Sequence, residues 1–291
     1  MVTDRRVIVL NRRASVELTR RPYTVEQIKG FDRLQIRNVT SQGFDQDGAS
    51  LLNSYVQPRD MEIKGQILAS TTYEMQGLRD KLLNLFLPKE ELTIKHSYGD
   101  ITRVINARVE QSPRFTFTNV SRIQNYDIAL TATEPFWRDE NETLVQIANV
   151  IGVFHFPLMI PKEKGVCFGI KQRALLKGIT NKSSMQAGMK FIFKANGKVN
   201  SPQLFNVNTR EYFRLLCTME AGEQIAVDTE AKTVTRARKG IREDYIGKID
   251  MQGGNTFLRL DPDENLFRCA ADEGEDMLEV WIYFHNRYMG V

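Results

Sequence analysis

The sequence predicts a mainly β protein of two domains: a curled, split-barrel-like antiparallel sheet with one packed helix, followed by a β-sandwich. Three observations support this prediction. Asn125–Asp139 alternates apolar and polar residues like a half-buried strand, and Glu134-Pro135 ends it because proline cannot donate to a strand ladder. Only Thr72–Leu87 shows convincing helical periodicity. Beyond residue 150, strands and turns alternate at a fairly regular spacing.

The chain length also indicates two domains. At 291 residues the chain exceeds what one hydrophobic core usually serves, and its 42% hydrophobic and 26% charged residues are typical of a globular protein. The pair Phe136-Trp137 closes the first domain, and the polar run Arg138–Thr143 follows it. We therefore predict a first domain over residues 1–140, a linker over 141–150 and a second domain over 151–291.

The first domain is predicted to contain two hairpins, several extended segments and the helix. A capping box formed by Thr71 and Glu74 begins the helix, and Pro88 ends it. One helix face is apolar, with Met75, Leu78, Leu82, Leu85 and Phe86. Arg33–Val39 is predicted as a half-buried strand because its apolar and polar residues alternate. The other strands are expected at Val7–Leu10, Ala14–Leu18, Leu51–Val56, Met61–Leu68, Glu91–Ser97 and Ile101–Val109.

The second domain is predicted to be built from strands and turns alone. Asn196-Gly197 is a strong hairpin signal, Gly253-Gly254 marks another turn, and Thr229–Lys232 is a four-residue hairpin loop. An apolar stretch, Val150–Pro161, opens the domain. The strands are expected at Met189–Lys194, Tyr212–Thr218, Gln224–Asp228, Thr233–Arg236, Thr256–Leu260, Leu266–Ala270 and Met277–His285.

The net charge of +4 equals the excess of six arginines over two acidic residues in the first 21 residues. Such a segment can be a solvated strand edge, because charges there discourage aggregation. It can also face an acidic partner or passing nucleic acid. The arginines concerned are Arg5, Arg6, Arg12, Arg13, Arg20 and Arg21.

The cysteines and hydropathy predict a soluble protein that folds in a reducing compartment. Cys167, Cys217 and Cys269 are odd in number and widely spaced, which argues against both a disulfide framework and a zinc site. The apolar run Val7–Leu10 is too short for a signal peptide, and no run approaches the ~20 residues that span a bilayer.

The sequence predicts no catalytic, cofactor or metal site. His96, His155 and His285 lie singly in apolar or strand-like stretches, and no metalloprotease, nucleophile-elbow or phosphate-loop motif is present. Asp261–Asn265 resembles the start of a calcium loop, but Leu266 stands where such a loop needs glycine. We interpret this segment as a proline-containing turn, and Asp272–Asp276 as a solvated turn.

The order of these elements resembles the distal tail protein (Dit) family of phages with long non-contractile tails. In the first domain the resemblance is carried by the helix Leu78–Phe86, the hairpin Thr93–Val109 and the strand ending Ile128–Trp137. In the second it follows Lys190–Leu215, Gly222–Thr235, Gly253–Cys269 and Val280–Val291. The family's Asn-Pro step appears here as Asn200-Ser201-Pro202, so its proline is displaced by one residue.

The resemblance implies an architecture and a location. Family members form hexameric rings through the first domain and carry a galectin-like sandwich outside. The ring joins the tail-tube protein to the tail-associated tip protein, holds receptor-binding or other baseplate proteins, and lets the genome pass through its hole. We therefore expect a homo-hexamer at the virion tail tip of a phage, prophage or tail-like particle, assembled in the host cytoplasm without membrane insertion. The basic segment is expected at a ring or tube contact, or lining the channel.

Two alternative functions are also considered. Galectin-like sandwiches can bind sugars by stacking an aromatic ring on a pyranose, and Trp281 and Tyr283 share the strand face opposite the aliphatic one. The chain is then a carbohydrate-binding accessory module; equally, these rings can simply pack against another layer. A hydrolase with an unrecognised site is the third hypothesis.

Overall fold

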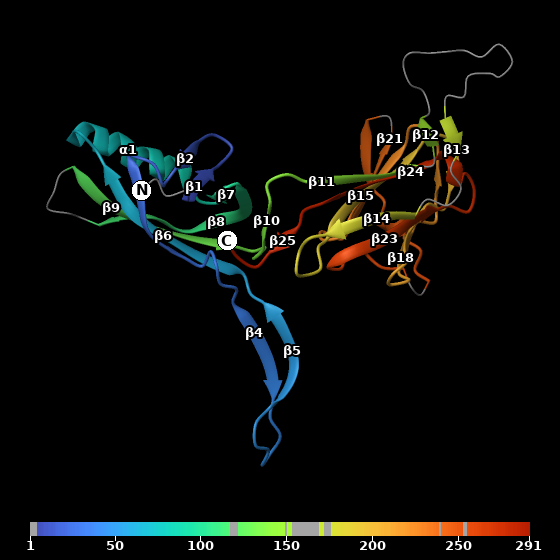
Figure 1. The fold of residues 1–291 in the computed structure, drawn as a ribbon, viewed down its shortest axis with the longest axis horizontal. Helices are drawn as coiled ribbons and strands as arrows, with labels where there is room; N and C mark the ends of the chain where they lie inside the picture. Colours follow the sequence, from blue (N-terminus) through green and yellow to red (C-terminus); the bar gives the residue numbers. More distant parts are fainter. Residues whose placement is uncertain are drawn as a thin grey trace, which may run out of the picture. The chain divides into compact units, whose positions relative to one another are not determined.

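The computed structural model describes residues 5–116, 122–148, 150–152, 169–171, 176–238, 240–252 and 255–291. The chain forms two compact units: Met1–Glu140 with Tyr288–Val291, and Asn141–Arg287 (Figure 1). Strands dominate both units, and α1 is the one α-helix of the described residues, so the predicted mainly β fold of two domains is confirmed. Among the described residues, no helix is both long and apolar enough to span a membrane.

The first unit is one curled antiparallel sheet. Its strands follow the order β2 (Ser15–Glu17), β1 (Arg5–Leu10), β7 (Glu91–Tyr98), β8 (Ile101–Thr116), β9 (Ile123–Ala132), β6 (Arg59–Leu68) and β3 (Tyr23–Lys29). β10 (Trp137–Asp139) pairs with the start of β8 and with β25 (Arg287–Tyr288).

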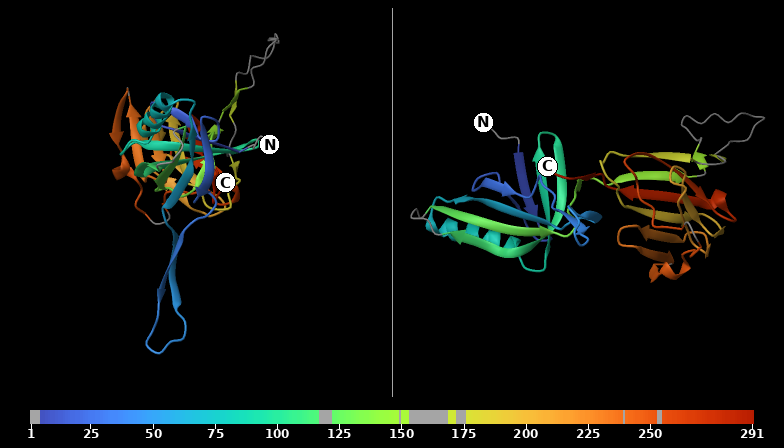
Figure 2. Two further views of the ribbon diagram at one scale, coloured as in Figure 1. Left: turned by 90° about the vertical axis from the view of Figure 1, so that its left-hand side faces the viewer. Right: turned by 90° about the horizontal axis from the view of Figure 1, so that it is seen from below.

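The curl of this sheet comes from β8. Its first half pairs with β7 and its second half pairs with β9 (Figure 2). The β8–β9 register shifts between Val109 and Gln111 and again between Gln111 and Arg114. Bulges of this kind bend a strand and increase its twist. The sheet therefore curls without closing, and β2 and β3 end its strand order.

The helix α1 (Thr72–Leu85) covers the sheet as predicted. Thr71 Oγ1 accepts from the Glu74 amide at 3.1 Å and caps the helix as predicted. The Glu74 carboxylate accepts from the Ser70 amide at 2.7 Å, one residue before the Thr71 amide that a capping box uses. Met75, Leu82 and Leu85 are buried, and Phe86 ends the helix slightly before the predicted Leu87.

A two-stranded ribbon, β4 (Ile36–Ser41) with β5 (Ser50–Val56), extends away from the rest of the first unit (Figures 1 and 2). We call residues 36–56 the arm. The predicted half-buried strand Arg33–Val39 is wrong, because the strand begins at Ile36 and every residue of β4 is exposed. Its alternation is that of a buried strand, but no described part of the chain covers it.

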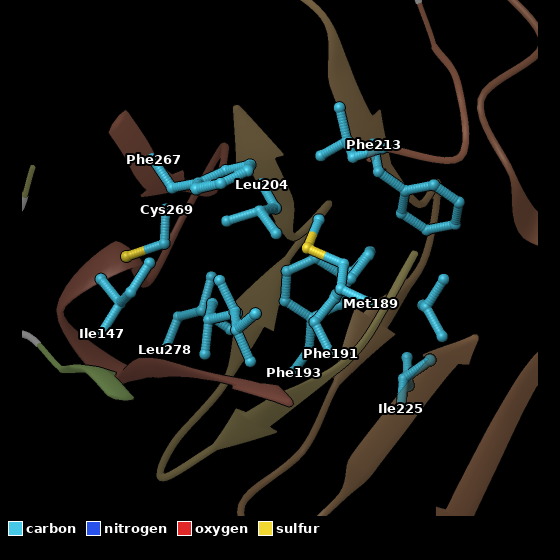
Figure 3. Close-up of a cluster of buried hydrophobic side chains, with 14 of the residues drawn as sticks. Ile147, Met189, Phe191, Phe193, Leu204, Phe213, Ile225, Phe267, Cys269 and Leu278 are labelled. Atoms are coloured by element: carbon cyan, nitrogen blue, oxygen red, sulfur yellow. The ribbon is translucent and has the colours of Figure 1, made fainter. Parts of the chain in front are cut away.

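The second unit is a β-sandwich. One sheet has the order β11 (Thr143–Ala148), β24 (Leu278–Phe284), β15 (Met189–Ala195), β20 (Gln224–Asp228), β21 (Thr233–Arg238) and β22 (Ile241–Asp244). The other has β14 (Leu176–Asn181), β23 (Asp263–Ala270), β17 (Gln203–Asn206) and β18 (Tyr212–Arg214). Phe191, Phe213 and Phe267 all belong to the core between them, where the rings of Phe191 and Phe213 lie 5.3 Å apart (Figure 3).

Short elements complete this unit. Two small ladders pair β12 (Val150–Gly152) with β13 (Gly169–Lys171), and β16 (Val199–Asn200) with β19 (Thr218–Met219). Two single-turn 3₁₀ helices, Ile246–Lys248 and Glu275–Met277, lie between strands.

Three predictions for the second domain need correction. The predicted linker 141–150 contains β11, whose Ile147 is buried in the sandwich, so these residues belong to the sheet. Asn196-Gly197 does not join a hairpin, because β15 and β16 lie in different sheets. Thr256–Leu260 is not a strand, although Leu258 and Leu260 are buried. Most of Val150–Pro161, with His155, Cys167 and Gly253-Gly254, lies outside the described residues.

Candidate assembly surfaces

The six N-terminal arginines are all exposed, and they are spread over β1 and the turns on either side of β2. Arg5 and Arg6 are neighbours on β1 and so point to opposite faces of the sheet. Arg6 pairs with Glu17 at 3.3 Å, while Arg13 lies at the β1–β2 turn and pairs with Glu90 at 3.6 Å. The remaining three, Arg12, Arg20 and Arg21, lie in turns. The basic segment therefore surrounds a sheet edge and forms no single patch.

Arg5 belongs to a pocket of about 340 Å³ at one end of β1, β7 and β8. In the strand register Arg5 stands opposite Tyr98, and Tyr98 stands opposite Ile101, so the three side chains share one face. His96 and Arg103 form the next pair on the same face. Val291 completes the lining. The pocket thus combines apolar walls with two guanidinium groups.

His96 is held neutral at the base of this pocket. It is buried, and its ring lies 5.9 Å from that of Phe31 and 6.2 Å from that of Trp137. Its Nε2 accepts from Arg5 Nε at 2.8 Å. Burial lowers the pKa of His96 from 6.5 to about 4, and the charges of Arg5 and Arg103 act in the same direction.

The arm carries six of the exposed large apolar side chains in the described part of the first unit. Phe44 at its tip is fully exposed, and Ile36, Leu51 and Leu52 are each more than 60% exposed. Val39 and Tyr55 are also exposed. Because Ile36 pairs with Val56 and Arg37 pairs with Tyr55, apolar groups lie on both faces of the ribbon.

Sequence reasoning missed the buried guanidinium of Arg59, which is 1% exposed. It donates to the carbonyls of Pro135 at 2.6 Å, Gly30 at 2.5 Å and Phe31 at 3.1 Å. Further bonds reach the carbonyls of Arg33 and Met289. Arg59 therefore ties together the root of the arm, the end of the first domain and the returning C-terminal segment. No local pattern around an arginine at the start of a strand signals this role.

Trp281 and Tyr283 lie where the sequence predicts, on the face of β24 that points away from the core. Trp281 Nε1 donates to Glu279 at 3.3 Å, and Lys194 Nζ lies 5.3 Å from the Trp281 ring centroid. Trp281 pairs with Ile192, which lines a polar groove of about 330 Å³ on the same sheet.

The other residues that the sequence analysis considered as chemical sites are the acidic turn Asp261–Asn265 and the cysteines. Asp261–Asn265 is a turn closed by Asn265, whose side chain bonds both the amide and the carbonyl of Asp261. Cys217 and Cys269 are free thiols, and burial raises the pKa of each to about 11. Within the described part of the chain, no three His, Cys, Asp or Glu side chains lie together as a metal site requires.

Two family models match the chain, one in each unit. Residues 15–132 match the phage tail protein RIFT-related domain, and residues 182–288 match the C-terminal domain of the siphovirus-type tail component. No curated protein matches the chain by sequence.

Solved structures share the whole fold. The distal tail protein (Dit) of phage SPP1, described as a paradigm of the hub adsorption apparatus of phages that infect Gram-positive bacteria, matches with a TM-score of 0.69 and 9% identity over 97% of this chain and 99% of that one. A chain of the phage p2 baseplate, in its activated conformation with Ca, matches with a TM-score of 0.54 and 13% identity over the full length of both chains. The strontium form gives a TM-score of 0.54 and 12% identity over 99% of each.

The fold and the two domain matches define a structural component of a siphovirus-type virion tail. The chain belongs to the distal tail protein (Dit) family of phage tail components.

Proposed function

We propose that six copies of this chain form a closed ring at the tail tip. The ring joins the tail tube to the tip protein and carries receptor-binding or accessory baseplate proteins, and the genome passes through its centre. The first domain, residues 1–140, makes the ring, and assembly takes place in the host cytoplasm. The membership of the chain in the Dit family and the baseplate context of its structural relatives support this proposal.

The observation that carries the proposal is the arm. A two-stranded ribbon is marginally stable on its own in water, and this one exposes Phe44, Leu51 and Leu52 to solvent. Exposed apolar surface of this kind marks an interaction site. A closed ring of identical subunits gives every arm one partner and leaves no arm free.

The basic segment offers a second contact within this proposal. Its exposed arginines suit a ring or tube contact, or the channel wall facing the nucleic acid backbone. Replacing Arg5, Arg6, Arg12 and Arg13 by Ser is expected to impair ring formation or tail assembly. Unchanged assembly of this variant would remove the basic segment from the proposal.

We also propose that the chain acts by binding alone and catalyses no reaction. This fits the structural role of its family. It also fits His96, which is buried and accepts a hydrogen bond from Arg5.

Sugar binding by the second unit is the alternative that a specific observation favours. Trp281 and Tyr283 lie on the same sheet face as the polar groove, which offers Lys190, Asp228 and Thr235 to sugar hydroxyls. Lys194 already lies over Trp281, which reduces the ring surface left for a pyranose. A glycan array of the whole chain without signal would remove this alternative.

The location is tested by immunogold labelling of tails from the particle that encodes the chain. We expect gold at the tail end remote from the capsid, in the region of the baseplate. Label along the tube or on the capsid would contradict the proposal.

A further inference from the structure

The tip of the arm presents an exposed aromatic side chain followed by two acidic residues. Phe44 is fully exposed and stands beside Asp45, with Asp47 two residues further on. The turn is held by Gln46, whose side-chain oxygen accepts from the Gly43 amide at 3.0 Å and whose carbonyl accepts from Gln42. The left-handed backbone of Asp45, with φ of 60°, tightens this turn. The tip is therefore a preformed acidic and aromatic knob.

The pocket at the end of β1 has the complementary chemistry. Tyr98 and Ile101, which are 69% and 61% exposed, form an apolar rim at the end of the β7–β8 hairpin. Arg5 and Arg103 supply positive charge, and the guanidinium of Arg103 stacks 3.7 Å above the Tyr288 ring. A volume of about 340 Å³ lies at the small end of binding pockets and suits one aromatic side chain.

The arm cannot fill the pocket of its own chain as it stands. The pocket is lined by Arg5 and Val291, close to the two ends of the chain. In two views at right angles, the arm extends away from β1 and from the marked C-terminal end (Figures 1 and 2). A knob that fills this pocket would therefore come from another molecule, and a second copy of this chain carries one.

We propose that Phe44 of one copy inserts into the pocket between Arg5 and Arg103 of the neighbouring copy, with Asp45 and Asp47 beside the two guanidinium groups. This inference rests on the proposed ring and specifies one of its contacts. Burial of one Phe side chain corresponds to a factor of about 10 to 100 in association, so Phe44→Ala weakens assembly by that factor. The ionic part weakens as salt is added.

Cysteine crosslinking of the full chain tests the contact directly. Phe44→Cys is combined with Ile101→Cys or with Tyr98→Cys, and the protein is oxidised and run on a non-reducing gel. We expect covalent multimers from at least one of the two pairs, because a seated tip brings these positions within disulfide reach. The matched controls are Phe44→Cys alone and Phe44→Cys with Tyr73→Cys, since Tyr73 is 90% exposed on α1, outside the pocket. Neither control is expected to form multimers.

Charge exchange provides a second test of the same contact. Asp45→Arg and Arg5→Glu are each expected to weaken assembly several-fold, and their combination is expected to restore it. Arg103 is left unchanged because it also bonds the carbonyl of Gly290.

The outcomes separate this inference from the proposed ring. A wild-type ring without crosslinks from either pair, or with crosslinks from Phe44→Cys alone, would overturn the tip-in-pocket contact and leave the ring standing. A wild-type chain that stays monomeric would overturn both.

Discussion

At the scale of single residues, Arg59 shows how one side chain can organise a domain. A buried guanidinium needs acceptors for its N–H groups, and here they are backbone carbonyls from three separate parts of the first unit. Burial lowers the pKa of Arg59, while nearby Asp32 raises it. The group stays charged because arginine titrates far above neutral pH.

Arg59→Met is expected to destabilise the first unit by about 3 kcal/mol or more, because it leaves several carbonyls without a donor. Urea unfolding followed by the fluorescence of buried Trp137 measures this, in a Trp281→Phe background so that only the first unit reports. Arg37→Met, at an exposed arm position, is the matched control and is expected to change stability by less than about 0.5 kcal/mol. Equal effects of the two substitutions would contradict this account of Arg59.

The pKa of His96 makes the first unit sensitive to acid. The unfolded chain takes up a proton near pH 6.5, whereas folded His96 takes it up only near pH 4. The contribution of neutral His96 to the stability of the first unit is therefore fully present above pH 6.5, and it is lost as the pH is lowered from 6.5 towards 4. We expect the urea midpoint of the first unit to drop between pH 7 and pH 5, and to drop less in His96→Gln. The same drop in both proteins would exclude His96 as the cause.

At the scale of elements, we expect the arm to be needed for assembly and not for the folding of the first unit. Its root is closed by the bond from the Gln57 amide to the Gln35 carbonyl, and the residues of the first core lie outside the arm. Replacing residues 36–56 by a short Gly-containing turn is expected to leave the unfolding of the first unit nearly unchanged and to abolish ring formation. Unfolding in urea and light scattering check the two parts. Rings formed by the armless chain would contradict the role of the arm.

The sequence predicted elements whose cause is local. Thr71 and Glu74 predicted the start of the helix because the hydrogen bond between them joins residues within one turn. The alternation in β9 predicted its buried side correctly, because that side packs in the core of the first unit. The same alternation gave a wrong prediction of burial at Ile36. A strand that its own chain covers and a strand that only another molecule can cover have the same sequence pattern. Asn196-Gly197 marked a turn correctly but could not tell which sheet follows it.

The sequence could not predict contacts between residues far apart in the chain. Arg59 meets Met289 across most of the chain, and the pocket joins Arg5, His96 and Val291 from three distant segments. The periodicity of apolar residues carries no information on such long-range contacts. The basic segment and the outward position of Trp281 were predicted, whereas the acidic and aromatic tip at Phe44 was not singled out.

At the scale of the whole molecule, the last residues of the chain belong to the first unit and not to the second. Tyr288–Val291 belong to the first unit, where β25 pairs with β10. Gly290 lies so close to Asp32 that an added Cβ would stand 2.8 Å from the Asp32 carbonyl oxygen, so a larger residue there must move the backbone. The first unit therefore contains residues from both sides of the second unit in the sequence. This connection links two domains that have separate hydrophobic cores.

The central claim is that identical copies close into a ring, and the mass of the purified full chain in solution tests it most directly. Light scattering coupled to size exclusion is expected to give about 200 kDa, six times the 33.5 kDa of one chain. A mass that stays at that of a single chain over the micromolar range would contradict the account.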